Sequence, residues 1–293
     1  MTAYVFPGQG AQFTGMGQSL YDLSGQAKAL FEQANDVLGY SLSDVMFTGT
    51  EEALRETKIT QPAIFVHSII AYLTAEVPPA PDAVAGHSLG EFSALVAAGV
   101  LSFPDALRLV SKRALAMQAA AEAEAGTMAA VLGLDDAMIE AACAELADVV
   151  VPANYNSPGQ LVISGSVAGI EAATKVLTDL GARRVLPLPV GGAFHSPLMA
   201  PAREQLREAI ETTRFDPAVC PVYQNIDAAA SLDPTEIKEK LIAQLTGAVR
   251  WTQTIECMLA AGIDRFVEVG GKGGILAGLI RKVDRKTPVE QLA

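Results

Sequence analysis

Residues 82–98 place Gly-His-Ser-Leu-Gly between a short apolar segment and a run of helix-forming residues. The apolar segment suits a buried strand, residues 89–98 are expected to begin a helix, and Gly86 and Gly90 allow strand and helix to approach closely. A G-x-S-x-G sequence in this context is typical of a nucleophile elbow, whose serine projects from the sheet near the positive end of the helix. The alternative is a plain glycine-punctuated turn. The choice depends on whether the chain supplies a base for Ser88.

The composition is that of a folded, acidic protein. Of the 293 residues, 50% are hydrophobic and 18% are charged, which favours a globular protein with a sizeable core over a disordered one. A formal net charge of −12 disfavours nonspecific attraction to nucleic acid or to an anionic membrane. Cys143, Cys220 and Cys257 have no metal-ligand spacing and suit reduced thiols.

No segment of the sequence has the features of a signal peptide or a membrane span. The chain does not open on a basic-then-apolar signal. Its most apolar helical run, residues 63–77, is interrupted by His67 and Ser68 and is too short to cross a bilayer. We therefore expect a cytoplasmic protein.

The first part of the chain is expected to supply one strand and several helices. Residues 3–10 predict a buried strand that ends in a Pro-Gly turn, and residues 16–39 have a helical period. Gln61-Pro62 is expected to open the apolar helix. A longer helix is predicted over residues 104–122.

The pattern of elements changes near Gly126. Residues 127–191 are expected to form a strand, a helix, two strands around an Asn-Ser-Pro-Gly turn, a second helix and a last strand. This order is the split pattern of a ferredoxin-like unit. We therefore predict an α/β protein of two domains: a large α/β-hydrolase-like domain over residues 1–126 and 192–293, and a small ferredoxin-like domain over residues 127–191.

The candidate base for Ser88 comes from a choice among three histidines. His67 lies in an apolar run, where a buried structural role is expected. His87 is adjacent to Ser88, and consecutive side chains in an extended segment point apart. His195 follows a strand and a flexible Gly-Gly pair, so it can approach Ser88 from a separate element. The alternative for His195 is an ordinary loop histidine.

Arg113 lies on the apolar stripe of the predicted helix over residues 104–122. Ala106, Leu109 and Met117 share its face, because they stand seven and four residues before it and four after it. A buried arginine needs an anionic partner. That partner is either a structural Asp or Glu or a carboxylate on a substrate.

Five motifs in the sequence match one family. "FPGQG", "GHSLGE", "RALAMQ", "NYNSPGQLVISG" and "AFHSPLM" together resemble the malonyl-CoA:acyl carrier protein transacylases, in family order and spacing. The resemblance runs from Tyr4 to about Leu279. In pattern the chain is similar to the stand-alone enzymes of fatty-acid synthesis and of polyketide synthases that lack built-in acyltransferases.

The resemblance implies a role for each matching residue. Ser88 is the implied nucleophile, His195 its base, and Arg113 the bidentate partner of the malonyl carboxylate. The other implied residues are the oxyanion-hole amides of Gln9 and Leu89, the acyl-pocket residues His87, Gln61, Asn154, Asn156 and Gln160, and the backbone carbonyl of Gln244, which orients His195 in place of an acid. Because only this carbonyl is implied, the Gln244 side chain is expected to be dispensable.

The implied reaction is ping-pong transfer of malonyl from malonyl-CoA to the phosphopantetheine thiol of an acyl carrier protein. It is expected to need no metal and no cofactor of its own. Phe194, directly before the histidine, resembles the malonyl-selective pattern and would narrow the acyl pocket. The alternatives are a serine thioesterase or hydrolase, transfer of another acyl group, and an inactive docking module.

Carrier proteins are acidic, so a carrier partner requires a local basic patch on this acidic chain. Arg183-Arg184 in the small domain and Arg281-Lys282 near the C-terminus are the candidate docking clusters. The alternative for each is a solvated surface pair. The expected oligomeric state is a monomer.

Overall fold

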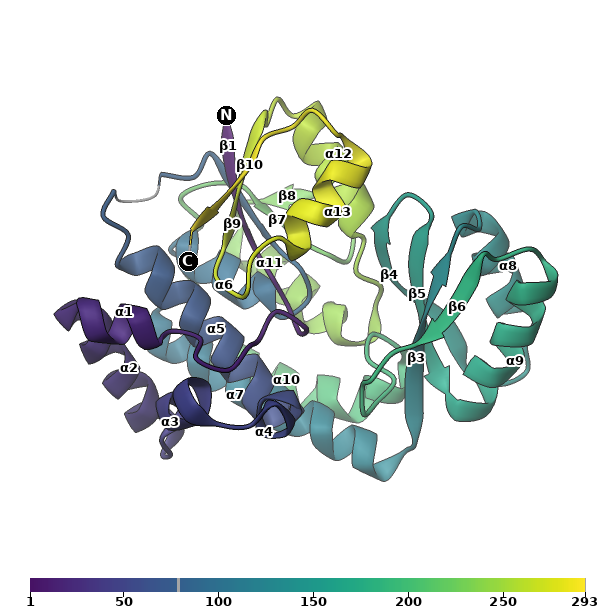
Figure 1. Ribbon diagram of the computed structural model, residues 1–293, viewed down its shortest axis with the longest axis horizontal. Coiled ribbons are helices and arrows are strands. Elements are labelled where there is room, and N and C mark those ends of the chain that lie inside the picture. Colours follow the sequence, from purple (N-terminus) through teal and green to yellow (C-terminus); the bar gives the residue numbers. More distant parts are fainter. Residues whose placement is uncertain (78–79, 293) are drawn as a thin grey trace.

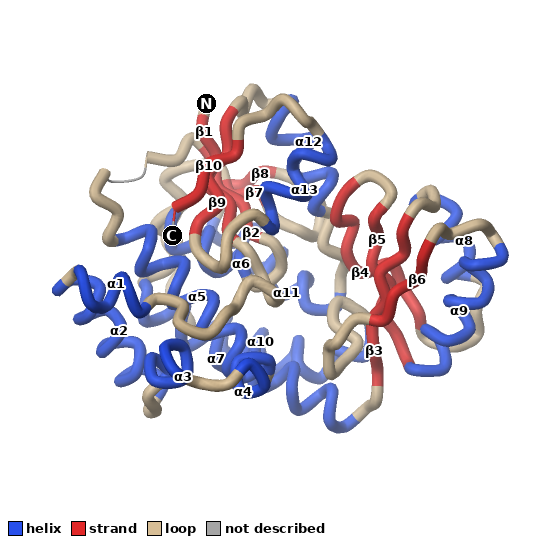
Figure 2. Tube along the Cα trace, viewed as in Figure 1, coloured by secondary structure: helices blue, strands red, loops and turns tan. Residues whose placement is uncertain are grey.

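The computed structural model describes residues 1–77 and 80–292 and contains, within them, two β-sheets (Figures 1 and 2). The strands of the larger sheet are β1 (Thr2–Phe6), β2 (Ala83–Gly86), β7 (Val222–Tyr223), β8 (Ala230–Ser231), β9 (Arg265–Val269) and β10 (Val289–Leu292). Their spatial order is β10-β9-β1-β2-β7-β8. All neighbours run parallel except β7 and β8, so the carboxyl ends of β1 and β2 lie side by side.

Helices pack around this sheet. They are α1 (Gln18–Leu23), α2 (Gly25–Leu38), α3 (Leu42–Thr48), α4 (Glu51–Arg55), α5 (Thr57–Leu73), α6 (Gly90–Ala97), α7 (Phe103–Ala123), α10 (Ala200–Thr212), α11 (Pro234–Ala243), α12 (Trp251–Ala260) and α13 (Ile275–Val283), with 3₁₀ turns at Pro197–Met199 and Gln244–Thr246. Within the described residues, none of the helices is long and apolar enough to cross a membrane.

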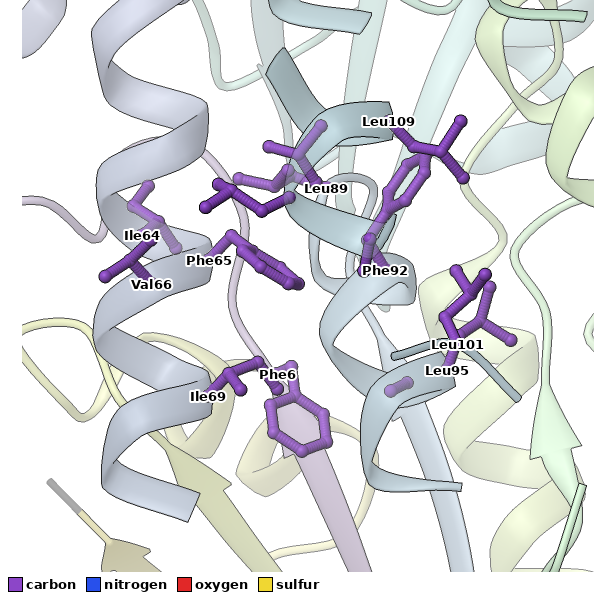
Figure 3. Packing of buried hydrophobic residues seen from close by; sticks show 14 of the residues in the cluster. Phe6, Ile64, Phe65, Val66, Ile69, Leu89, Phe92, Leu95, Leu101 and Leu109 are labelled. Carbon is purple, nitrogen blue, oxygen red and sulfur yellow. The ribbon is translucent and has the colours of Figure 1, made fainter. Parts of the chain in front are cut away.

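The main core lies where α5, α6 and α7 meet the sheet. Figure 3 shows Phe65 and Ile69 of α5 in one apolar cluster with Phe6 of β1 and Phe92 of α6. All four side chains are fully buried, and burying each stabilises the fold by about 1.5–3 kcal/mol. The packing holds the junction between β2 and α6, which carries Ser88, against a rigid support.

The second sheet is small and antiparallel. Its elements in chain order are β3 (Gly126–Leu132), α8 (Asp136–Ala144), β4 (Val150–Ser157), β5 (Gln160–Ser166), α9 (Val167–Asp179) and β6 (Arg184–Pro187). The strand order is β4-β5-β3-β6, and α8 and α9 cover one face (Figure 1). This is the predicted ferredoxin-like arrangement, and the predicted α/β fold class is confirmed.

The helical period of residues 16–39 is confirmed, whereas the expected start of the apolar helix is wrong. Residues 16–39 form two helices, because Ser24 adopts an extended backbone and its hydroxyl caps α2 by accepting from the Ala27 N–H. The apolar helix α5 begins at Thr57, so Pro62 lies inside it. Pro62 is near the start of α5, where its missing N–H removes only one early helical hydrogen bond.

Backbone contacts join the two sheets at β4. Val249 of the large part forms a parallel bridge with Asn154 of β4. Its carbonyl accepts from the Tyr155 N–H at 2.9 Å and its own N–H donates to the Ala153 carbonyl at 2.8 Å. The Thr252 hydroxyl adds a bond to the Tyr155 carbonyl at 3.0 Å. These contacts fix β4 beside the start of α12.

Candidate active site

Ser88 lies at the turn between β2 and α6, with a φ of 53°. This left-handed backbone is uncommon for a residue with a side chain. A Cβ on Gly86 would overlap the Gly90 backbone, and a Cβ on Gly90 would overlap the carbonyl of Phe6. Both glycines are therefore required by close approach, and the turn has the geometry of the predicted elbow.

Asn225, which follows β7, fastens this turn. Its Oδ1 accepts from the Ser88 N–H at 2.7 Å, and its Nδ2 donates to the Gly86 carbonyl at 2.7 Å. The side chain thus pairs with two backbone groups on either side of His87. These bonds offset the strain of the left-handed serine.

His195 approaches Ser88 from the loop before α10. Its Nε2 lies 2.7 Å from the Ser88 Oγ, and its Nδ1 lies 3.0 Å from the Gln244 carbonyl and 3.2 Å from the Gly247 carbonyl. Both carbonyls are acceptors, so Nδ1 carries the proton and Nε2 is free to accept from Ser88. In the described part of the chain no Asp or Glu oxygen lies within 4.0 Å of the ring.

His195 is held in its neutral form. Burial and, after it, the nearby Arg113 cation lower the pKa of its imidazole to about 3, against the opposing bond to the Gln244 carbonyl. The ring is only 4% exposed. A neutral imidazole next to a serine hydroxyl can act as a general base at physiological pH.

Arg113 is buried on α7 and completes the group around Ser88. Its Nη1 donates to the Gln61 Oε1 at 2.6 Å, and its Nη2 donates to the Ser88 Oγ at 3.1 Å and to the Gln244 Oε1 at 3.2 Å. Its Nε has no partner, and among the described residues no carboxylate lies within 4.0 Å of the guanidinium. Burial lowers the pKa of Arg113 to about 10, so it stays a cation at neutral pH.

The Gln244 side chain makes contacts that the sequence did not predict. It is fully buried, and its Nε2 donates to the Ser88 carbonyl at 2.8 Å and to the Glu91 Oε2 at 2.7 Å. Its Oε1 accepts from Arg113. Gln244 therefore contacts His195 through its backbone, and Ser88, Glu91 and Arg113 through its amide.

Two backbone N–H groups beside Ser88 are available for an oxyanion. Among the described residues, neither the Gln9 N–H nor the Leu89 N–H donates a hydrogen bond within the protein. The Ser88 N–H is already used by Asn225. The loop after β1, which carries Gly8 and Gln9, lies close to His87, since a Cβ on Gly8 would meet the His87 carbonyl. Two free amides near a nucleophile suit an oxyanion hole.

This geometry agrees with the comparisons with known proteins. The family model described as an acyl transferase domain matches residues 3–293. The chain belongs to the acyl transferase family. The acyl transferase is 44% identical over 288 residues to the malonyl CoA-acyl carrier protein transacylase of Bacillus subtilis, covering 97% of this chain and 90% of that protein.

Solved structures match over nearly the full length. An acyl carrier protein S-malonyltransferase from Vibrio cholerae has a TM-score of 0.95 at 40% identity, over 99% of this chain and 96% of that one. A malonyl-transacylase solved in complex with a type II polyketide synthase acyl carrier protein has a TM-score of 0.94 at 38% identity, over 99% and 95%.

A cleft of about 610 Å³ lies between the two sheets of the acyl transferase and contains the Ser88 side chain. Predicted residues that line it are Gln9, His87, Ser88, Leu89, Arg113, Asn154, Asn156, Phe194 and His195. The His87 Nε2 lies 2.8 Å from the Asn156 Oδ1, which fixes the imidazole at the cleft wall. Met128, Val162 and Leu188 supply an apolar wall from the small sheet.

Two residues predicted for the acyl pocket do not line the cleft. Gln61 is buried behind the wall, where its amide oxygen holds Arg113 and its Nε2 contacts the Met117 sulfur at 3.4 Å. Gln160 lies at the hairpin end of β5, where its Oε1 accepts from the Lys282 Nζ at 2.6 Å. Val162, which is two residues after Gln160 on the same face of β5, lines the cleft instead.

The two predicted docking clusters lie on the surface of the acyl transferase. Arg183 and Arg184 are exposed at the start of the edge strand β6, and Arg281 and Lys282 are exposed in the last turn of α13. None of the four has an acidic partner within 4.0 Å in the described residues. Lys282 is held by Gln160, so one cluster also joins the two sheets.

The sequence reasoning missed Glu91 and Asn225. Glu91 is an isolated charge in a nearly all-apolar helix, which is the same signal that identified Arg113. Asn225 directly follows β7, but this strand is two residues long and has no readable pattern. Its position at a carboxyl strand end, next to Ser88, depends on the sheet order alone.

Proposed function

We propose that the protein transfers a malonyl group from malonyl-CoA to the phosphopantetheine thiol of an acyl carrier protein, through a malonyl ester on Ser88. The observation that carries the proposal is the Ser88 hydroxyl, which lies between a neutral base, His195, and a buried cation without a carboxylate partner, Arg113. The names of the relatives, all malonyl transacylases or malonyltransferases, support the same substrate.

In the first half-reaction Ser88 Oγ attacks the thioester carbonyl while His195 Nε2 takes the hydroxyl proton. The N–H groups of Gln9 and Leu89 stabilise the negative oxygen that forms. The C–S bond then breaks, and the departing sulfur of coenzyme A takes the proton from His195. The product is the malonyl ester of Ser88.

In the second half-reaction the carrier thiol gives its proton to His195 and attacks the ester carbonyl. The same two amides hold the oxyanion. The bond to Ser88 breaks and the serine oxygen regains its proton from His195. The reaction exchanges one thioester for another, and the named residues and substrates account for every bond and proton without a metal or a cofactor.

Selection of malonyl is proposed to come from Arg113, which would bind the free carboxylate of the acyl group through two parallel hydrogen bonds. Phe194, which lines the cleft, would restrict bulk at the α-carbon. The carrier is proposed to dock on Arg183-Arg184 or Arg281-Lys282. We also propose that the protein is a monomer and that it acts in the cytoplasm.

The test is incubation with radiolabelled malonyl-CoA, with and without holo-carrier protein, followed by intact-mass measurement. We expect one added malonyl on the protein alone and loss of that label to the carrier when it is present. Release of free malonate at the same rate without carrier would instead identify a hydrolase.

Ser88→Ala is expected to abolish the added mass, because no other group is positioned to accept the acyl. Ser93→Ala is the matched control: Ser93 is a buried serine on α6 whose hydroxyl has no partner, and its loss should leave acylation unchanged. A single malonyl on Ser88→Ala protein would show that another residue is the nucleophile.

A further inference from the structure

Glu91 is a buried carboxylate that the proposed reaction does not use. It lies in the first turn of α6 and is 1% exposed. Its Oε1 accepts from the Asn225 N–H and its Oε2 accepts from the Gln244 Nε2. Both of its oxygens therefore face donors on elements distant in sequence. Neither contact reaches the cleft directly.

The amide of Gln244 lies between the Glu91 carboxyl group and the Arg113 cation. Its Nε2 faces Glu91 and the Ser88 carbonyl, while its Oε1 faces the Arg113 guanidinium. The positive end of the amide dipole thus points to the carboxylate and the negative end to the cation. The reverse orientation would put N–H groups against the N–H groups of Arg113. The orientation of this amide matters because Gln61 and Gln244 are the only side-chain amides that Arg113 contacts in the described residues.

We propose that Glu91 is a positioning residue for Arg113: by accepting from the Gln244 Nε2, it fixes the amide orientation that holds the guanidinium fork ready for the substrate carboxylate. The inference rests on the proposed malonyl transfer. Glu91 does not contact the acyl group, and it affects the choice of acyl group through the Gln244 side-chain amide.

The surroundings of Glu91 act on its ionisation in opposite directions. Burial raises the pKa of its carboxyl to about 8, while the Asn225 N–H, the Gln244 amide and the Arg113 cation oppose that rise, and Asp227 adds to it. Because both oxygens face donors, a proton on either oxygen would compete with one of these contacts. The hydrogen bonds therefore favour the carboxylate and burial favours the acid, and with a pKa of about 8 the group takes up a proton as the pH falls through neutrality.

The test is Glu91→Gln, which keeps the shape and removes one acceptor. The Asn225 backbone N–H stays a donor, so the amide oxygen of the new glutamine at position 91 must face it and the NH₂ must face Gln244. The Gln244 side-chain amide then has to turn over to accept from that NH₂, which places its own NH₂ against Arg113. We expect the ratio of malonyl to acetyl transfer, measured as kcat/KM, to fall at least about tenfold, the size of one charge-assisted hydrogen bond.

Glu268→Gln is the matched control. Glu268 is also 1% exposed, and it accepts only from backbone N–H groups at the start of α13. We expect this variant to lower the melting temperature and to leave the malonyl-to-acetyl ratio unchanged. If Glu91→Gln lowers both transfers by one factor, as a general loss of folded protein would, Glu91 is structural and the proposal is wrong.

The charge swap Glu91→Gln with Gln244→Glu tests the proposal even if the single variant does not fold. It restores a donor–acceptor pair between positions 91 and 244 but brings a carboxylate directly against Arg113. The Ser88 carbonyl loses its donor, so melting temperature should recover only in part. We expect the malonyl preference to remain lost, because Arg113 is already paired. Recovery of the preference would overturn the proposal.

Failure of the proposed function gives a different result from failure of this inference. If the unmodified protein gains no mass from malonyl-CoA, malonyl transfer itself is wrong. If it gains malonyl and Glu91→Gln keeps the same malonyl-to-acetyl ratio, only the role of Glu91 is wrong.

Discussion

At the scale of single residues, Arg113 is a buried cation whose hydrogen-bond partners are all neutral. An acyl group without a carboxylate leaves it in that state, whereas malonyl supplies an anion. Arg113→Ala should therefore reduce malonyl transfer by about ten- to several-hundred-fold, from about 1.5–3 kcal/mol for each charge-assisted bond. Acetyl transfer should fall much less. Arg113→Lys should recover malonyl transfer only partly, because it lacks the planar fork. Equal loss of malonyl and acetyl transfer in steady-state assays would show a structural role.

At the scale of elements, the loop between β9 and α13 resembles a glycine-rich phosphate site, but the protein supplies the anion itself. The Glu268 carboxylate accepts from the N–H groups of Gly274, Ile275, Leu276 and Ala277 at 3.0–3.1 Å. Glu268→Gln keeps one acceptor and should lower the free energy of unfolding by about 2 kcal/mol or more, since buried donors lose partners. Urea denaturation measures this. The exposed Glu290→Gln is the control, with an expected change within about 0.5 kcal/mol, and equal effects of the two variants would contradict the prediction.

At the scale of the whole molecule, all three histidines favour the neutral form. Burial lowers the pKa of His67 to about 4 and that of His195 to about 3, and it also lowers the pKa of His87. In the unfolded chain these rings titrate near 6.5. Between those values the unfolded state binds more protons, so stability is fully present above pH 6.5 and is lost as pH falls. Glu91, with its raised pKa, has the opposite effect and gains stability as pH falls from about 8.

We expect the free energy of unfolding to decrease from pH 7 to pH 5 in chemical denaturation, since three rings outweigh one carboxyl. His67→Asn should reduce this slope by up to about 1.4 kcal/mol per pH unit, the contribution of one proton. Asparagine keeps an acceptor for the Gly271 N–H, which bonds the His67 Nδ1 at 3.0 Å. An unchanged slope in this variant would show that His67 does not contribute.

The sequence predicts those parts of the site that have a local signal. Ser88 stands in a turn motif, Arg113 interrupts an apolar helical stripe, and His195 remains after elimination, and the structure brings all three together. Gln244 is the first residue of a 3₁₀ turn, and the contacts of its amide depend on where α11, α6 and α7 converge. The hydrophobic periodicity of the sequence does not indicate where three helices converge.

The same difference holds for the fold. The ferredoxin-like pattern is local, since its strands and helices follow one another, and it was predictable from their order. The order of the large sheet is not local: β1 pairs with β2 and β9, which are about 80 and 260 residues away. The short strand β7, which places Asn225, was therefore beyond prediction.

The acceptors that orient His195 are the peptide oxygens of Gln244 and Gly247. Every amino acid carries this oxygen, so no codon change at either position can delete it. A histidine oriented by an aspartate can lose its partner through a single nucleotide substitution. Here any residue at positions 244 and 247 supplies the acceptor, so a change at Gln244 acts through its amide contacts with Ser88, Glu91 and Arg113 and not through the orientation of His195.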